Sequence, residues 1–103
     1  MSQQAGWIFP RSQEKAAPEE LVGQTVVLDA AGQFVYLGTL KRMDEHFIEL
    51  EDADVHDGSE SPTPKERYII ESKKYGVKKN RKTVYVRAAL VTSMSRLEDV
   101  IEY

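Results

Sequence analysis

The chain has 103 residues, a net charge of −3 and no cysteine, so it is long enough for one domain and too short for two. The absence of cysteine excludes a disulfide framework, thiolate metal sites and a thiol nucleophile. No apolar run approaches the roughly 20 residues of a membrane span, and the first residues lack the pattern of a secretory signal. We therefore expect a cytoplasmic protein without cofactor or metal and without a membrane partner.

The N-terminal segment, residues 1–17, is typical of a flexible arm with one isolated apolar cluster at residues 7–9. Pro18 suits the first position of a helix, and the two glutamates that follow it suit the first turn. Gly23 ends whatever begins there. The pattern predicts a short helix or a single turn.

Three strands are expected next in the chain. The β-branched content of residues 25–29 predicts the first, and residues 33–43 predict a second, longer one. Gly38 lies in the middle of the second, where a glycine often marks a bulge or a bend. Residues 46–52 alternate and predict a half-buried third strand.

The remaining segments follow in order. Residues 54–64 have the composition of a loop, residues 66–75 contain an apolar run that predicts a strand, and residues 76–82 read as a basic turn. Residues 83–87 predict a clear strand, which resumes at 90–94. Residues 97–103 contain apolar residues at helical spacing, which predicts a C-terminal tail or a short helix. Such a sheet of five or six short strands is best closed as a small barrel.

The net charge conceals a sharp asymmetry. Residues 44–60 contain eight acidic residues and no Lys or Arg, whereas residues 65–82 contain eight basic residues and two acidic ones. Because local charge decides what a surface attracts, the basic block could bind an anion such as RNA. It could equally pair with the acidic block of a neighbouring subunit, or be a solvated hairpin.

Three segments together resemble the Sm-like (LSm/Hfq-type) family. The segment 18–28, PEELVGQTVVL, resembles the helix and first strand of that family. Gly38-Thr39-Leu40 followed by Asp44 and by residues 50–53 resembles its first motif, and residues 83–91, TVYVRAALV, resemble its second. The resemblance implies a mostly β fold: a short N-terminal helix and a small, bent five-stranded antiparallel barrel over 18–96, with an inserted basic arm at about 55–82.

The resemblance also implies a function, which is non-catalytic binding of single-stranded RNA by a cyclic homo-oligomer. His46 falls at the position that stacks on a base, Arg87 at the position that covers its other face, and Asp44 at the position that orients the loop. Phe47 takes the place of a methionine that packs inward. The Asn that reads the base edge is either deleted after Phe47 or replaced by Ile48, so we expect weak base specificity.

The basic arm is a second candidate RNA surface. Its cations are interleaved with an aromatic residue, which suits a phosphate backbone and one stacked base; the candidate residues are Lys73, Lys74, Tyr75, Lys78, Lys79, Arg81 and Lys82. The alternative is an exposed hairpin whose lysines prevent edge-to-edge strand pairing.

No catalytic constellation in the sequence is convincing, because its serines lack an evident His–acid partner and there is no glycine-rich phosphate loop. Asp54, His56 and Asp57 match no closed zinc site. The rival to RNA binding is a protein-interaction or ring-forming scaffold module with an SH3-like or Sm-like barrel and no RNA ligand. A third possibility is a structural protein of a phage or mobile element that uses the fold for ring assembly.

Overall fold

The computed structural model describes residues 17–61 and 63–102. The arm expected over 1–17, with its apolar cluster at 7–9, therefore lies outside the described residues except for Ala17. The elements in chain order are α1 (Ala17–Glu20), β1 (Thr25–Ala30), β2 (Phe34–Met43), β3 (Phe47–Asp57), α2 (Lys65–Tyr75), β4 (Arg81–Arg87), the 3-10 turn η1 (Ala88–Leu90), β5 (Val91–Arg96) and the 3-10 turn η2 (Leu97–Asp99).

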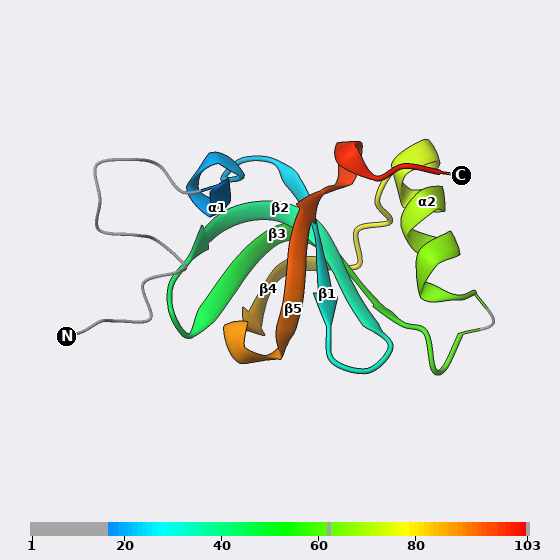
Figure 1. Cartoon of the computed structure of the whole chain (residues 1–103), viewed down its shortest axis with the longest axis horizontal. Coiled ribbons are helices and arrows are strands. Elements are labelled where there is room, and N and C mark those ends of the chain that lie inside the picture. The colour runs from blue at the N-terminus through cyan, green and yellow to red at the C-terminus, as the bar shows by residue number, and fades with distance from the viewer. Residues whose placement is uncertain (1–16, 62, 103) are drawn as a thin grey trace.

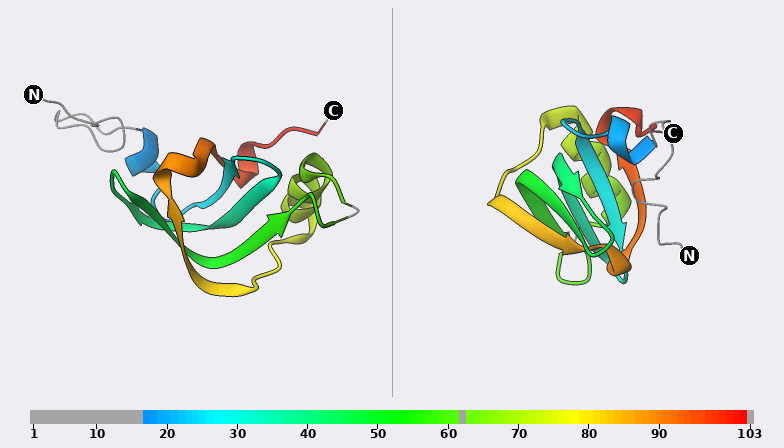
Figure 2. Two further views of the ribbon diagram at one scale, coloured as in Figure 1. Left: turned by 90° about the horizontal axis from the view of Figure 1, so that it is seen from below. Right: turned by 90° about the vertical axis from the view of Figure 1, so that its left-hand side faces the viewer.

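The strands form one antiparallel sheet in the order β4-β3-β2-β1-β5. Figure 2 shows that this sheet is strongly curved. The prediction of a mostly β fold with five antiparallel strands is confirmed. Contrary to the sequence prediction, the two end strands do not pair to close the sheet into a barrel: in the part of the chain that the structure describes, β4 pairs only with β3 and β5 only with β1. Each of these two strands therefore keeps one open edge.

Gly38 is where β2 bends over β3. The register between the strands shifts between Leu37 and Thr39, and a Cβ at position 38 would lie 3.0 Å from the Cβ of Ala53 and 3.1 Å from the carbonyl oxygen of Glu51. Backbones that approach this closely leave room only for glycine. The bend predicted at Gly38 is confirmed.

The main core lies on the inner face of the curved sheet. Its central side chains, Leu28, Leu40 and Leu50, are completely buried. The buried cluster comprises Leu21, Val26, Leu28, Leu40, Met43, Ile48, Leu50, Ala53, Val86 and Ala88. Because β-branched and leucine side chains from four strands and from the segment after α1 meet there, the sheet must curve to enclose them.

The segment after β3 differs from the sequence prediction. Residues 54–57 continue β3, and the strand expected over 66–75 is instead the helix α2. The apolar run around Ile69 is β-branched and favours a strand locally, but the helix buries Ile69 and Ser72 three residues apart on one side. Gly76, with φ 96°, ends the helix, and its N–H donates to the carbonyl of Ser72.

The helix α2 and the C-terminal tail build a second, smaller core on the outer face of the sheet. Its buried members are Val27, Val35, Leu37, Ile69 and Leu97. Figure 1 shows α2 beside the C-terminus, at the opposite end of the molecule from α1. The Lys73 Nζ donates to the carbonyl of Val100. The inserted segment is thus packed onto the domain and is not a free arm.

Polar contacts join α2 to the end of β3. The Tyr68 hydroxyl donates to Asp54 Oδ2 at 2.5 Å, and the His56 ring stacks on Tyr68 with 4.0 Å between ring centroids. Burial and the neighbouring Asp54 raise the pKa of Tyr68, so its hydroxyl stays a donor. Within residues 17–61 and 63–102 no group of three His, Asp or Glu side chains is placed to hold a metal ion. No helix in the same ranges is long and apolar enough to cross a membrane.

Candidate nucleic-acid interface

The turn between β2 and β3 is organised by Asp44. Its Oδ1 accepts hydrogen bonds from the backbone N–H groups of His46 and Phe47, both at 2.8 Å. These two bonds lower the pKa of Asp44 below its ordinary value. The carboxylate therefore holds the backbone of the turn in one conformation and fixes where the following side chains begin.

His46 and Arg87 are brought together at this end of the sheet. The N–H of Ala88, the residue after Arg87, donates to the carbonyl of His46 at 2.8 Å. Both side chains are exposed, and among the described residues Arg87 forms no ion pair. The His46 ring lies 3.6 Å from Glu45 Oε1. The backbone contact with Ala88 thus places an exposed imidazole and an exposed guanidinium at the same end of the sheet. Both are groups that can stack on a planar base.

Phe47 does not pack inward, and the expectation that it would is wrong. Its ring is 44% exposed, and it lies opposite Arg87 in the β3–β4 register. The physical reason is the alternation of the strand: Ile48 takes the inward position and is 1% exposed. Because Ile48 belongs to the core, it cannot replace the edge-reading Asn.

Ala88 fits the second motif without strain. It is the first residue of η1 and is buried in the main core. In the described part of the chain, Asp52 is the only non-glycine residue with a positive φ. Alanine at position 88 therefore meets no conformational barrier.

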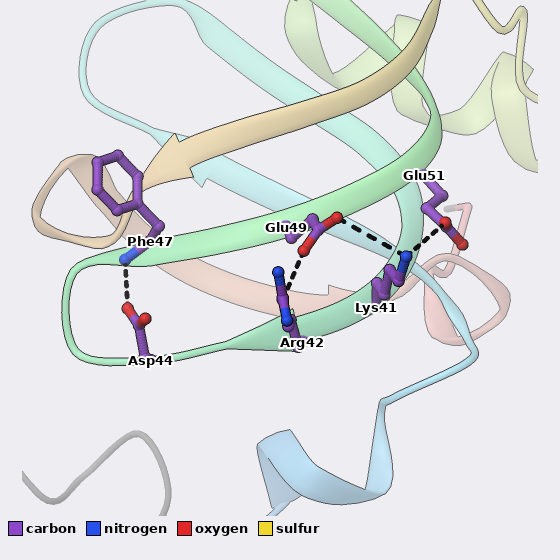
Figure 3. Close-up of polar contacts among 6 residues, drawn as sticks. All are labelled: Lys41, Arg42, Asp44, Phe47, Glu49 and Glu51. Carbon is purple, nitrogen blue, oxygen red and sulfur yellow. Dashed lines mark hydrogen bonds and ion pairs between the residues drawn. The ribbon is translucent and has the colours of Figure 1, made fainter.

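A pocket of about 500 Å³ opens on the outer face beside this turn, lined by Arg42, Met43, Asp44, Phe47, Glu49 and Tyr85. Glu49 is 6% exposed, and its Oε1 accepts a hydrogen bond from Arg42 Nε at 2.7 Å. Figure 3 shows Glu49 between Arg42 and Lys41, with Phe47 two residues before it on the same strand. Tyr85, opposite Glu49 in the register, is 60% exposed.

Comparisons with known proteins support the fold and nothing finer. No model of a protein family matches the chain, and no curated protein matches its sequence. Among solved structures, it is similar to the Sm protein of Pyrococcus abyssii in complex with a uridine heptamer, with a TM-score of 0.52 and 19% identity over 76% of this chain and 89% of that one. The protein has an Sm-like fold. It is also similar to a chain of the NatC complex bound to CoA, with a TM-score of 0.50 and 14% identity over 80% of this chain and 86% of that one.

The basic segment, residues 73–82 of the basic arm, lies away from the Asp44 turn in this Sm-like fold. Arg81 begins β4 and Arg87 ends it, so the two are separated by the length of the strand, roughly 20 Å at 3.3 Å per residue. Lys73 and Lys74 contact the C-terminal tail through Val100 and Glu102. The candidate RNA-binding residues of the Asp44 turn and those of the basic segment therefore lie at two separate places in the structure.

The remaining cations of the segment are exposed. They are Lys78, Lys79, Arg81 and Lys82, and none forms an ion pair among the residues that the structure describes. Tyr75 is 83% exposed at the end of α2. These groups are accessible to a phosphate backbone, and their role in binding stays a prediction.

Sequence reasoning missed the pocket residues Arg42, Glu49 and Tyr85. It also missed Lys41, which forms ion pairs with Glu49 and Glu51. The alternation of residues 47, 49 and 51 against 83, 85 and 87 was visible as a signal, because it places each set on one face. The pairing of β2, β3 and β4 decides which face of the sheet each set occupies and which residues lie opposite one another. The two register shifts in β2 make that pairing unreadable from the sequence.

Proposed function

We propose that this protein binds single-stranded RNA, without catalysis, as a cyclic homo-oligomer in the cytoplasm. One observation carries the proposal: in an Sm-like fold, the Asp44-organised turn presents His46 beside Arg87, with both side chains exposed. An imidazole and a guanidinium at such a turn provide two planar surfaces between which a base can stack. The similar Pyrococcus abyssii Sm protein is bound to a uridine heptamer.

The open edges of β4 and β5 support the ring. Unpaired strand edges readily pair with another chain. An edge β4 on one subunit and an edge β5 on the next form a head-to-tail contact, which closes into a ring when the rotation between subunits allows it. The number of subunits follows from that rotation.

The direct test combines mass with binding. Multi-angle light scattering at micromolar concentration should give a multiple of the 11.7 kDa chain mass, and a labelled uridine heptamer should bind with an affinity that falls as salt rises. A monomer would contradict the ring. An oligomer that binds no RNA at low salt would contradict RNA binding and leave the ring intact.

The rival function is a protein-interaction or scaffold module. The observation in its favour is that Ile48 is buried where an edge-reading side chain is needed, together with the similarity to a chain of the NatC complex. On this alternative, the open strand edges would pair with a different protein. Binding of RNA that is abolished by substitution of His46 or Arg87 would decide against it.

A further inference from the structure

The pocket on the outer face combines three chemical features that act on one ligand. Its lining includes the exposed aromatic side chains of Phe47 and Tyr85, the buried carboxylate of Glu49 and the guanidinium of Arg42. The volume, about 500 Å³, is within the range of pockets that hold small ligands.

The carboxylate of Glu49 is partly unused. Oε1 accepts from Arg42 Nε at 2.7 Å, whereas Oε2, among the residues that the structure describes, pairs only with Lys41 Nζ, at 4.0 Å. Lys41 lies closer to Glu51, at 3.2 Å. Figure 3 shows the Glu49 carboxylate between Arg42 and Lys41. Each carboxylate oxygen can accept two hydrogen bonds, so Glu49, which lines the pocket, retains acceptor capacity.

A carboxylate selects among nucleobases, because an ionised carboxylate accepts hydrogen bonds and donates none. Guanine presents two adjacent donors, N1–H and N2–H, on its Watson–Crick edge. Uracil presents one donor between two carbonyl acceptors, and adenine and cytosine each place a ring acceptor beside the amino group. Guanine alone can therefore donate twice to one carboxylate without facing it with an acceptor.

We infer that this pocket is a guanine-binding subsite of the RNA surface. Phe47 and Tyr85 provide the stacking surfaces, Glu49 accepts from N1–H and N2–H, and Lys41 and Arg42 lie where the adjoining phosphate is attracted. The two cations are 50% and 74% exposed in their side chains. The inference rests on the proposed function, and it adds to the His46–Arg87 stacking site a neighbouring site that reads one base.

Three labelled RNA heptamers test the inference on the unaltered protein: heptauridine, and the same strand with a single central guanosine or adenosine. The guanosine strand should bind at least about tenfold more tightly than the other two, the size of one good bidentate base contact. Equal binding of all three would overturn the guanine subsite and leave RNA binding intact. No binding of any strand at low salt would overturn the proposed function itself.

Variants assign the preference to its residues. Glu49→Gln places an amide donor before the base and should reduce the guanosine preference to within about twofold, whereas Arg42→Met keeps the carboxylate and should weaken all three strands alike. Phe47→Leu should weaken the guanosine strand most, and Phe34→Leu, at a site of similar exposure (39% against 44%), should change nothing. A guanosine preference that survives Glu49→Gln in a folded protein would overturn the role of Glu49.

Discussion

Lys74 of α2 and Glu102 of the C-terminal tail form an ion pair, with 2.8 Å between Nζ and Oε1. The hydrogen bond and charge of Glu102 raise the pKa of Lys74. Part of the positive charge of the basic segment is therefore already neutralised by an ion pair within the chain. The cations of residues 78–82 have no such partner among the described residues, so the segment divides into a structural half and an accessible half.

The first prediction follows from that division. Replacing Lys78, Lys79, Arg81 and Lys82 together by glutamine should weaken binding of all RNA sequences alike. The slope of log affinity against log salt should flatten by roughly 0.7 for each phosphate that the variant no longer neutralises, because fewer counterions are released. Filter binding of a labelled single strand over a salt series measures the slope.

The matched control for this variant replaces Lys73 and Lys74, which contact the tail. It should change the salt slope much less. If the fourfold variant bound RNA as well as the parent, the basic segment would be purely structural and the scaffold function would gain support.

The second prediction concerns the inserted helix as part of the core. Ile69→Ala should lower the free energy of unfolding by about 2–5 kcal/mol, because Ile69 is 4% exposed and its truncation leaves a cavity against Leu37 and Leu97 in the second core. Urea denaturation measures the change. The neighbouring Ile70, only half-buried, is the matched control, and Ile70→Ala should cost clearly less. Equal effects would mean that α2 is not anchored through Ile69.

The third prediction concerns the hydrogen bond between Tyr68 and Asp54. Tyr68→Phe removes the donor and leaves the carboxylate of Asp54, which is 7% exposed, without it. The expected cost is about 1–3 kcal/mol of unfolding free energy. Tyr75→Phe removes a hydroxyl from an 83% exposed ring and should be neutral. A neutral Tyr68→Phe would show that water replaces the hydroxyl.

The helix α2 shows why sequence reasoning succeeded for some elements and failed for others. β1 and β4 are rich in β-branched residues, and the bend at Gly38 has a local cause, so each was predictable from its own segment. The run around Ile69 has the same local composition, yet it is helical because packing against β1, β2 and the tail rewards burial of one side. Local preference is weak and distant contacts override it.

The candidate site likewise has a part that local sequence predicts and a part that depends on distant contacts. Asp44 caps a turn through bonds to residues two and three positions later, which is a local relationship that a motif can reveal. The pocket around Glu49 depends on three strands in one register, and the pairing of β2 with β3 contains shifts. A single shift exchanges inward and outward side chains, so this pairing cannot be read from one segment. Phe47 was assigned to the wrong face because it takes the place of an inward-packing methionine in the motif, whereas Ile48 holds the inward position in the structure.

The fourth prediction concerns pH and the Asp44 turn. The pKa of Asp44 is lowered in the folded protein by two backbone hydrogen bonds, so its stabilising effect is fully present above the unfolded pKa of about 3.9. The effect disappears as the pH falls through the lower, folded pKa. Asp44→Ala should therefore lower the melting temperature at neutral pH, and the difference from the parent should shrink as the pH falls below about 4. A difference that is the same at pH 3 and pH 7 would contradict this role.

The fifth prediction distinguishes base stacking from phosphate attraction at the His46–Arg87 site. His46→Ala should weaken RNA binding by on the order of 1–3 kcal/mol with little change in the salt slope, because it removes one stacked ring and leaves the phosphate-binding cations in place. His46→Phe should restore most of the affinity, and His56→Ala, whose ring stacks on Tyr68 at the far end of β3, should have no effect on binding. The same filter-binding series measures all three.

The same site also predicts how the affinities for oligouridine and oligoadenine compare. Ile48 lies in the core and cannot read a base edge, and a stacking site by itself discriminates weakly because every base has a π-face. Oligouridine and oligoadenine should therefore bind within about tenfold of each other, roughly 1.4 kcal/mol. A strong uridine preference that His46→Ala abolishes would mean that another group beside His46 reads the base edge. The turn held by Asp44 would then be a specificity site in addition to a stacking site.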